Sequence, residues 1–319
     1  MSPRCVRARR HPCREPGPPA AFTVSDIRAD SVTLSWEPPA GEVQNYSVTC
    51  SSGEDVVQEF QTEETSVTIR DLRPGQQYLF SVCAQLQRLQ SEAAETSTHT
   101  KPGQPAAFTV SDIRADSVTL SWEPPAGEVQ NYSVTCSSGE DVVQEFQTEE
   151  TSVTIRDLRP GQQYLFSVCA QLQRPQSEAA EISTHTKPGQ PAAFTVSDIR
   201  ADSVTLSWEP PAGEVQNYSV TCSSGEDVVQ EFQTEETRVT IRYLRPGQQY
   251  LFSVCAQLQR LQSEAAETST HTIIKELQEN SNEIESQELN YAEVNVRAAQ
   301  RPQRSLRQME PHVVYSSTR

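Results

Sequence analysis

The sequence predicts an all-β protein with three β-sandwich domains in tandem, followed by a disordered tail. Two observations carry this prediction. One unit of 86 residues is written three times almost letter for letter, so that the run starting at Ala20 recurs from Ala106 and from Ala192. Within each unit, apolar residues alternate with polar ones, which is the period of a strand with one buried face. A unit this long is a whole small domain, because solenoid repeats span about 20 to 50 residues.

The repeat divides the chain of 319 residues into five parts. We expect a disordered N-terminal segment at 1–16, three repeats at 17–102, 103–188 and 189–274, and a disordered tail at 275–319. The tail is polar, has few large apolar residues and shows no sustained period, which is typical of a segment that cannot form a core. Each repeat is long enough to fold by itself, although it buries only about 60 to 65% of its unfolded surface.

Within the first repeat the alternation predicts about seven strands, the density of a two-sheet antiparallel sandwich. Val32, Leu34 and Trp36 share one face of a strand at 31–36. Turn signals rich in Pro, Gly and Ser separate the strands at 37–41, 51–53 and 73–75. The other strands are expected at 22–27, 46–50, 56–60, 67–69, 78–84 and 94–98.

Three runs of the first repeat carry a family resemblance: Ser35-Trp36-Glu37-Pro38-Pro39, Tyr46-Ser47-Val48 and Leu72-Arg73-Pro74-Gly75-Gln76-Gln77-Tyr78. They resemble the fibronectin type III domain, an immunoglobulin-like sandwich, and the resemblance covers residues 17–274. It implies that Trp36 fills the space between two sheets. It also implies a tyrosine corner, in which the ring of Tyr78 packs inward and its hydroxyl binds a nearby backbone group. The repeats look like those in the ectodomains of receptor tyrosine phosphatases.

Charge and motifs argue against nucleic-acid binding and against catalysis. The net charge is −17, and residues 17–102 carry twelve acidic against five basic side chains. Such an acidic array is a poor partner for phosphates, which need Lys and Arg on one face. The sequence has no Gly-rich phosphate loop and no His and Cys at metal-ligand spacing. It also lacks the His-Cys…Arg loop of the tyrosine phosphatases, so we expect no enzyme activity, no cofactor and no metal.

The two cysteines of the first repeat, Cys50 and Cys83, recur in the other two repeats. An even number of cysteines, in a type of domain that is common outside cells, is compatible with a disulfide. The alternation, however, puts Cys50 on the face of Tyr46 and Val48, whereas Cys83 falls opposite the face of Phe80. We expect the two sulfurs on opposite faces of one sheet, which disfavours a bridge within the repeat. Free thiols and links between chains stay open.

Asn45-Tyr46-Ser47 matches the acceptor sequence for N-glycosylation, and the same sequence recurs at Asn131 and Asn217. Alternation puts Asn45 on the outer face of its strand, where a glycan has room. These three asparagines are candidate sites if the chain enters the secretory pathway.

The tail contains a second recognisable pattern. Tyr291 has Leu289 two residues before it and Val294 three residues after it. This spacing resembles the immunoreceptor tyrosine-based inhibitory motif, which after phosphorylation binds SH2 domains. Tyr315 is a weaker match, because Val313 precedes it correctly but Thr318 stands where the family has an aliphatic residue. The resemblance implies an SH2-domain partner, such as a tandem-SH2 tyrosine phosphatase.

The sequence shows neither a signal peptide in residues 1–16 nor any apolar run of 18 residues that would span a membrane. The family resemblance nevertheless implies a plasma-membrane protein with extracellular repeats. We therefore expect that a signal exon in front and a membrane exon behind the repeats are absent from this form of the chain. The sequence predicts an adhesion or recognition protein with an unknown protein ligand and a signalling tail. The alternative is a soluble spacer or binding array without a signalling role.

Overall fold

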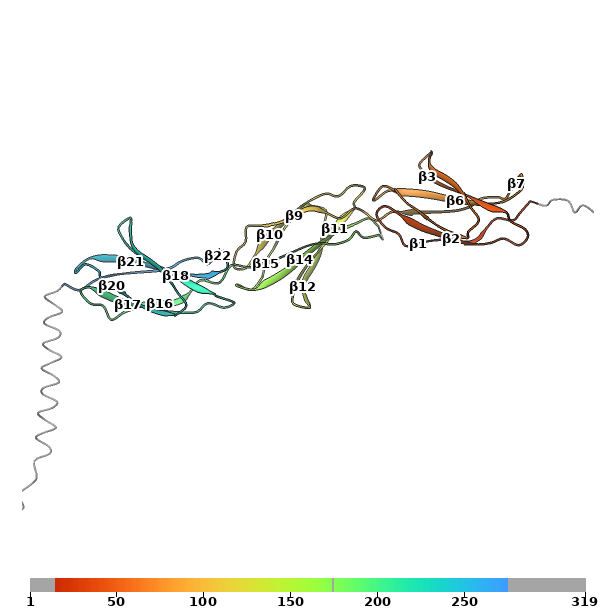
Figure 1. Cartoon of the computed structure of the whole chain (residues 1–319). Helices are drawn as coiled ribbons and strands as arrows, with labels where there is room; N and C mark the ends of the chain where they lie inside the picture. The colour runs from red at the N-terminus through yellow and green to blue at the C-terminus, as the bar shows by residue number, and fades with distance from the viewer. Residues whose placement is uncertain (1–14, 174, 275–319) are drawn as a thin grey trace, which may run out of the picture. The chain divides into compact units, whose positions relative to one another are not determined.

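The structure, a computed structural model, describes residues 15–173 and 175–274. This part of the chain is all-β, with strands β1 to β23 in three groups of similar order (Figure 1). The predicted all-β class and the three sandwiches are thus confirmed. The predictions of disorder at the N-terminus, apart from Glu15 and Pro16, and at 275–319 concern residues outside the described range.

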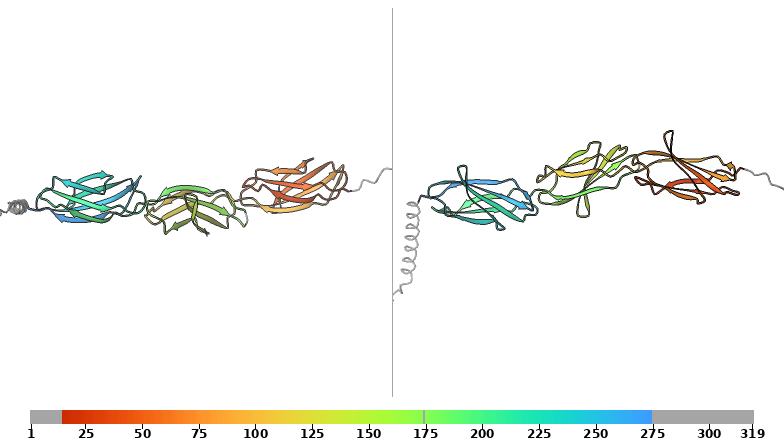
Figure 2. Two further views of the ribbon diagram at one scale, coloured as in Figure 1. Left: turned by 90° about the horizontal axis from the view of Figure 1, so that it is seen from below. Right: turned by 45° about the horizontal axis from the view of Figure 1, so that its top comes forward.

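Repeat 1 contains two antiparallel sheets that face each other as two layers (Figure 2). The smaller sheet has the order β1-β2-β5, and the larger has the order β4-β3-β6, with β7 and β8 both paired to β6. The strands are β1 (Ala20–Ser25), β2 (Val32–Glu37), β3 (Asn45–Ser52), β4 (Asp55–Thr62), β5 (Ser66–Ile69), β6 (Gln77–Leu86), β7 (Leu89–Gln90) and β8 (Ala94–His99).

The core of repeat 1 lies between the two sheets, and the alternation decides which side chains reach it. In β2 the buried residues are Val32, Leu34 and Trp36. The ring of Trp36 meets the ring of Tyr46 edge-on, with 5.3 Å between the ring centroids. Tryptophan thus lies between the sheets as predicted. Full burial of a Leu, Val or Phe side chain contributes about 1.5 to 3 kcal/mol, so the alternating strands supply most of the driving force for this fold.

Repeats 2 and 3 follow the same plan. In repeat 2 the sheets have the orders β13-β10-β9 and β12-β11-β14-β15, and in repeat 3 the orders are β16-β17-β20 and β19-β18-β21, with β22 and β23 paired to β21. The strands of repeat 2 are β9 (Ala106–Ser111), β10 (Val118–Glu123), β11 (Asn131–Ser138), β12 (Asp141–Thr148), β13 (Ser152–Ile155), β14 (Gln163–Gln171) and β15 (Ala180–His185). Those of repeat 3 are β16 (Ala192–Ser197), β17 (Ser203–Glu209), β18 (Asn217–Ser224), β19 (Asp227–Thr234), β20 (Arg238–Arg242), β21 (Gln249–Leu258), β22 (Leu261–Gln262) and β23 (Ala266–His271).

One hairpin differs between the repeats. In repeats 1 and 3 the short strands β7 and β22 each pair two residues with the preceding long strand. Repeat 2 has Pro175 where repeat 1 has Leu89, and proline has no N–H to donate to a ladder. The pairing there is reduced to a single bridge between Gln171 and Gln176. These short strands were not predicted, because two residues are too few to show an alternation.

The first strand begins and ends earlier than predicted. It runs from Ala20 to Ser25 and is followed by Asp26, whose φ of 45° lies outside the extended region. Near its start, Ala21 has a φ of 48° and the pairing register with β2 shifts. The alternation of apolar and polar residues does not reveal such a bulge, because the bulge adds one unpaired residue to the strand and so shifts the alternation.

Candidate functional site

The tyrosine motifs lie outside the described residues. This applies to Tyr291 with its flanking residues Leu289 and Val294, and to Tyr315 with Val313 and Thr318. They stay predictions from the sequence.

The glycosylation candidates lie at the first residue of β3 and of its counterparts β11 and β18. Asn45 is half-buried, and its Nδ2 donates a hydrogen bond of 3.2 Å to Oε1 of Gln61 on β4. Asn131 makes the same contact with Gln147 at 3.4 Å. The Oδ1 atom of Asn45 is buried and has no hydrogen-bond partner in the described part of the chain. The nitrogen that would carry a glycan is therefore engaged with a neighbouring side chain in the folded repeat.

The cysteines lie as the alternation predicted. Cys50 is fully buried in the core and pairs across the ladder with Phe80, whereas Cys83 is half-buried and lies opposite Ser47 on the other face of the sheet. The two are separate thiols. Burial raises the pKa of the Cys50 thiol to about 11, and the same holds for Cys136 and Cys222. A thiol in this state is a poor nucleophile at neutral pH, because only the thiolate reacts readily.

An exposed apolar surface occurs on the larger sheet of every repeat. In repeat 1 it consists of Val56 at 61% exposure and Val57 at 46%, both on β4, and Leu79 at 42% on β6. Residues Val142, Val143 and Leu165 form the copy in repeat 2, and Val228, Val229 and Leu251 the copy in repeat 3. Sequence reasoning missed this surface. The available signal was that Val56 and Val57 are adjacent, since two neighbours in a strand cannot both face the core.

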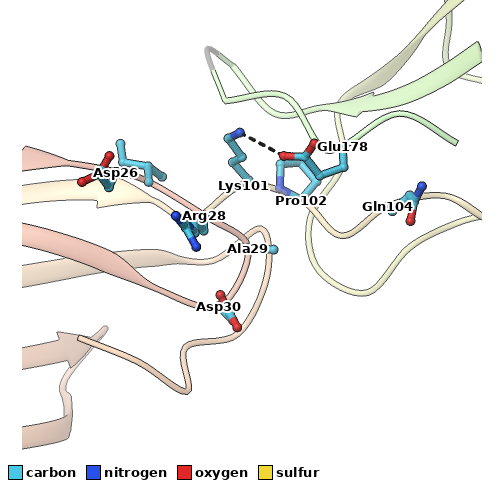
Figure 3. A pocket seen from close by; sticks show the side chains of 9 residues that line it. Asp26, Arg28, Ala29, Asp30, Lys101, Pro102, Gln104 and Glu178 are labelled. Carbon is cyan, nitrogen blue, oxygen red and sulfur yellow. Dashed lines mark hydrogen bonds and ion pairs between the residues drawn. The ribbon is translucent and has the colours of Figure 1, made fainter. Parts of the chain in front are cut away.

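An open pocket lies beside the linker that follows repeat 1 (Figure 3). Its lining residues are 26–30, Lys101, Pro102, Gln104 and Glu178. Nζ of Lys101 lies 3.5 Å from Oε1 of Glu178, and the two side chains are 34% and 83% exposed. An ion pair this exposed contributes at most about 1 kcal/mol. The pocket combines charges of both signs in open solvent, which gives it no evident chemical selectivity.

Apart from Ile273 and Ile274 at its end, the third repeat differs from both other repeats at two positions, 238 and 243. Arg238 replaces the serine of the earlier copies and forms an ion pair of 3.0 Å with Asp198. Tyr243 replaces Asp71, is 91% exposed and keeps the positive φ of that position, at 62°. A bulky residue with such a φ is uncommon, because its Cβ crowds the backbone.

Two further properties concern the described residues as a whole. Within 15–173 and 175–274, no three His, Cys, Asp or Glu side chains gather closely enough to hold a metal ion. In the same ranges, no helix has the length and apolar character needed to cross a bilayer.

Comparison with known proteins agrees with the geometry. The model of the fibronectin type III domain matches residues 17–100, 103–183 and 189–272. Tenascin-N of Mus musculus is 26% identical over 262 residues, which is 80% of this chain and 17% of that protein. Receptor-type tyrosine-protein phosphatase H of Homo sapiens is 30% identical over 253 residues, which is 75% of this chain and 22% of that protein. The chain thus spans about a fifth of the length of these curated relatives.

Among solved structures, a segment of two fibronectin type III domains from chicken tenascin is 27% identical, with a TM-score of 0.38. The alignment covers 53% of this chain and 99% of the tenascin segment. The three segments matched by the family model make up most of the chain, and each covers one of the sandwiches described above, the second segment ending at residue 183 within β15. The chain therefore belongs to the fibronectin type III domain family and carries three copies of the domain in tandem.

Proposed function

We propose that this chain is a non-enzymatic recognition or adhesion protein whose tail recruits SH2-domain proteins after tyrosine phosphorylation. The recognition half is supported by the three fibronectin type III repeats and by their similarity to tenascins. The signalling half rests on one observation in the sequence, the spacing of Leu289, Tyr291 and Val294.

The chemistry of the tail suits this role. Phosphorylation adds about −1.5 to −2 charges and three acceptor oxygens to a tyrosine. An SH2 domain binds the phosphate with Arg, and an apolar slot of the domain takes the side chain three residues later. Tyr291 and Tyr315 are 24 residues apart. A coil of that length spans roughly 25 to 30 Å on average, which lets one reader with two SH2 domains engage both.

A binding experiment on the whole chain tests the signalling half. The protein is phosphorylated with a tyrosine kinase, and its affinity for a tandem-SH2 phosphatase is measured by surface plasmon resonance. We expect binding that requires phosphorylation and that weakens at least tenfold in Tyr291→Phe. A reader whose phosphate-binding arginines are replaced is the control. If the phosphorylated chain fails to bind, the signalling half of the proposal is wrong.

A second function, a soluble spacer or binding array without signalling, is favoured by the near identity of the three repeats. Identical copies present one surface three times, which suits spacing or multivalent binding. Sequencing of transcripts across residues 272–288 separates the two functions. A transcript with a membrane-spanning exon at this junction supports the receptor, and transcripts that all read straight through support the soluble array.

We further propose that Asn45, Asn131 and Asn217 are glycosylated in any form of the chain that is secreted. A glycan on Nδ2 of Asn45 would stand at the end of β3, beside Gln61, and would displace the hydrogen bond that links these two side chains. Asn45 is half-buried and does not belong to the hydrophobic core of repeat 1.

A further inference from the structure

The strand β4 forms a free edge of the larger sheet in repeat 1. It pairs with β3 on one side, and in the described part of the chain no strand pairs with its other side. Half of the backbone N–H and C=O groups of such a strand point away from the sheet and are available to another strand. The equivalent strands β12 and β19 are edges in the same way.

This edge has only part of the usual protection against a further strand, namely a bulge and the charges of Asp55 and Glu59. Natural edge strands are short, carry charged residues (lysine above all) or proline, twist away at a bulge, or are covered. β4 is eight residues long and contains neither lysine nor proline. The bulge opposite Cys50 and Ser51 makes Val57 an extra residue in the ladder, and the adjacent Val56 and Val57 are both largely exposed.

The apolar surface continues from the edge across the sheet. Val56 lies opposite Ser51 in the ladder, and Ser51 lies opposite Leu79 of β6. These three residues therefore share the outer face, with the small Ser51 between Val56 and Leu79. A strand added at β4 would extend this row by one position.

The charge around the edge selects the kind of partner. Residues 54–64 hold five acidic side chains and no basic one: Glu54, Asp55, Glu59, Glu63 and Glu64. All five are exposed. A second copy of the same strand would bring these carboxylates against their own equivalents, which is unfavourable. A strand that carries Lys or Arg would instead meet opposite charges.

We propose that the β4 edge of each repeat, with β12 and β19, binds an extended basic segment of a partner protein, which joins the sheet as an additional strand. Backbone hydrogen bonds supply the pairing, an apolar side chain of the partner packs on Val56 and Val57, and its Lys or Arg side chains lie against the acidic residues that flank them. Since the edge occurs three times, a partner with several basic segments gains avidity over a single contact.

The test is a titration of the full chain with a capped nonapeptide that alternates valine or threonine with lysine or arginine. Isothermal titration calorimetry should find three equivalent sites. A version of the peptide with N-methyl groups on the amides of one edge keeps its side chains and charges but loses backbone donors. We expect it to bind at least tenfold more weakly.

A matched pair of variants tests the position of the site. Glu59 lies in one row across the sheet with Thr49, Ser81 and Glu95, so that Glu59 and Glu95 occupy opposite edge strands of the same face. Reversal of charge at Glu59, Glu145 and Glu231 to Lys should weaken binding about tenfold. The same reversal at Glu95, Glu181 and Glu267 changes the net charge equally and should leave the affinity within about twofold.

Three results would overturn the proposal. The first is the absence of binding by the unmethylated peptide. The second is equal affinity of the methylated and unmethylated peptides, which would show adsorption to an acidic surface without strand pairing. The third is an equal loss in both sets of charge reversals. The near-ultraviolet circular dichroism of Trp36, Trp122 and Trp208 verifies that every variant keeps its fold.

Discussion

The hydroxyl of Tyr78 accepts a hydrogen bond of 2.9 Å from the backbone N–H of Arg73, five residues earlier in the chain. The carbonyl of the same Arg73 accepts a hydrogen bond of 2.7 Å from Oγ1 of Thr100, which follows the last strand. Both backbone groups of one loop residue are thus satisfied by side chains from other parts of the repeat. The first bond recurs at 2.9 Å in the other two repeats, between Tyr164 and Arg159 and between Tyr250 and Arg245.

Replacement of Tyr78 by Phe should destabilise repeat 1 by about 1 to 3 kcal/mol, because the N–H of Arg73 loses its partner in a part-buried site. The ring stays in the core, so the loss reports the hydroxyl alone. Urea unfolding of residues 17–102 measures the free energy of unfolding. The control is Tyr243→Phe in residues 189–274, which removes a hydroxyl from a side chain that is 91% exposed. Equal effects of the two changes would contradict the role of the corner.

Replacement of Tyr243 by Asp should stabilise repeat 3 by about 1 kcal/mol, because a left-handed backbone conformation costs a bulky residue more than it costs Asp. The earlier repeats hold Asp71 and Asp157 at this position, with φ angles of 60° and 59°, so the fold accepts the change. The reverse change, Asp71→Tyr in repeat 1, should destabilise by a similar amount. Thermal unfolding of the separate repeats measures both, and a stability loss in Tyr243→Asp would show that the exposed ring makes contacts that outweigh the strain.

The sequence predicted the sandwiches because the alternation, the Pro-Gly turns and the tryptophan all indicate the same fold. It also predicted that Cys50 and Cys83 lie on opposite faces of one sheet, because this follows from the alternation along the strands alone. It did not reveal the bulges, since Ala21 and Val57 each interrupt an alternation locally while the strand continues. The exposed edge of β4 escaped for a related reason: whether a strand has one neighbour or two depends on the sheet order, which the pattern along a strand does not contain.

Alkylation should distinguish the two cysteines of repeat 1. At pH 8 a thiol with a pKa of about 11 is only about 0.1% thiolate, so native Cys50 should resist iodoacetamide while the half-buried Cys83 reacts. In urea both should react. Peptide mass mapping after a timed exposure gives the extent of labelling at each site. Equal labelling rates in the native protein would mean that the core around Cys50 opens readily.

The same raised pKa predicts how stability depends on pH. The folded repeat keeps the Cys50 proton up to a pH of about 11, whereas the unfolded chain loses it near its ordinary pKa of 9.0. The folded state therefore binds more protons between these values, and stability falls as the pH rises from 9 to 11. Cys50→Ala removes this contribution and should flatten the profile over that range. Urea unfolding at several pH values compares the two proteins, and identical slopes would contradict the assignment.

Secretion of the chain from a mammalian cell behind an added signal peptide should yield a glycoprotein with up to three glycans. Asn45→Gln together with Asn131→Gln and Asn217→Gln should abolish the mass increase, which treatment with a peptide N-glycosidase also removes. Gln61→Ala should leave modification of Asn45 intact, because the hydrogen bond between them forms only in the folded sheet. A secreted chain without any mass increase would show that the acceptor sequences are not used.

The two tail tyrosines should differ in affinity for an SH2 reader. Val294 offers the reader's slot an aliphatic side chain, and full burial of such a side chain is worth about 1.5 to 3 kcal/mol. Thr318 offers a methyl group and a hydroxyl, and the hydroxyl must be desolvated, which costs free energy unless it is paired. Phosphopeptides centred on Tyr291 should therefore bind a tandem-SH2 phosphatase about tenfold more tightly than those centred on Tyr315, a difference of about 1.4 kcal/mol.

In the same peptides Val294→Thr should erase this difference, and Thr318→Val should strengthen the second site. Calorimetry on the four synthetic phosphopeptides measures all of these affinities. Equal affinity of the two native peptides would mean that the residue three positions after the tyrosine is not read, and the inhibitory-motif interpretation of the tail would then lose its physical basis.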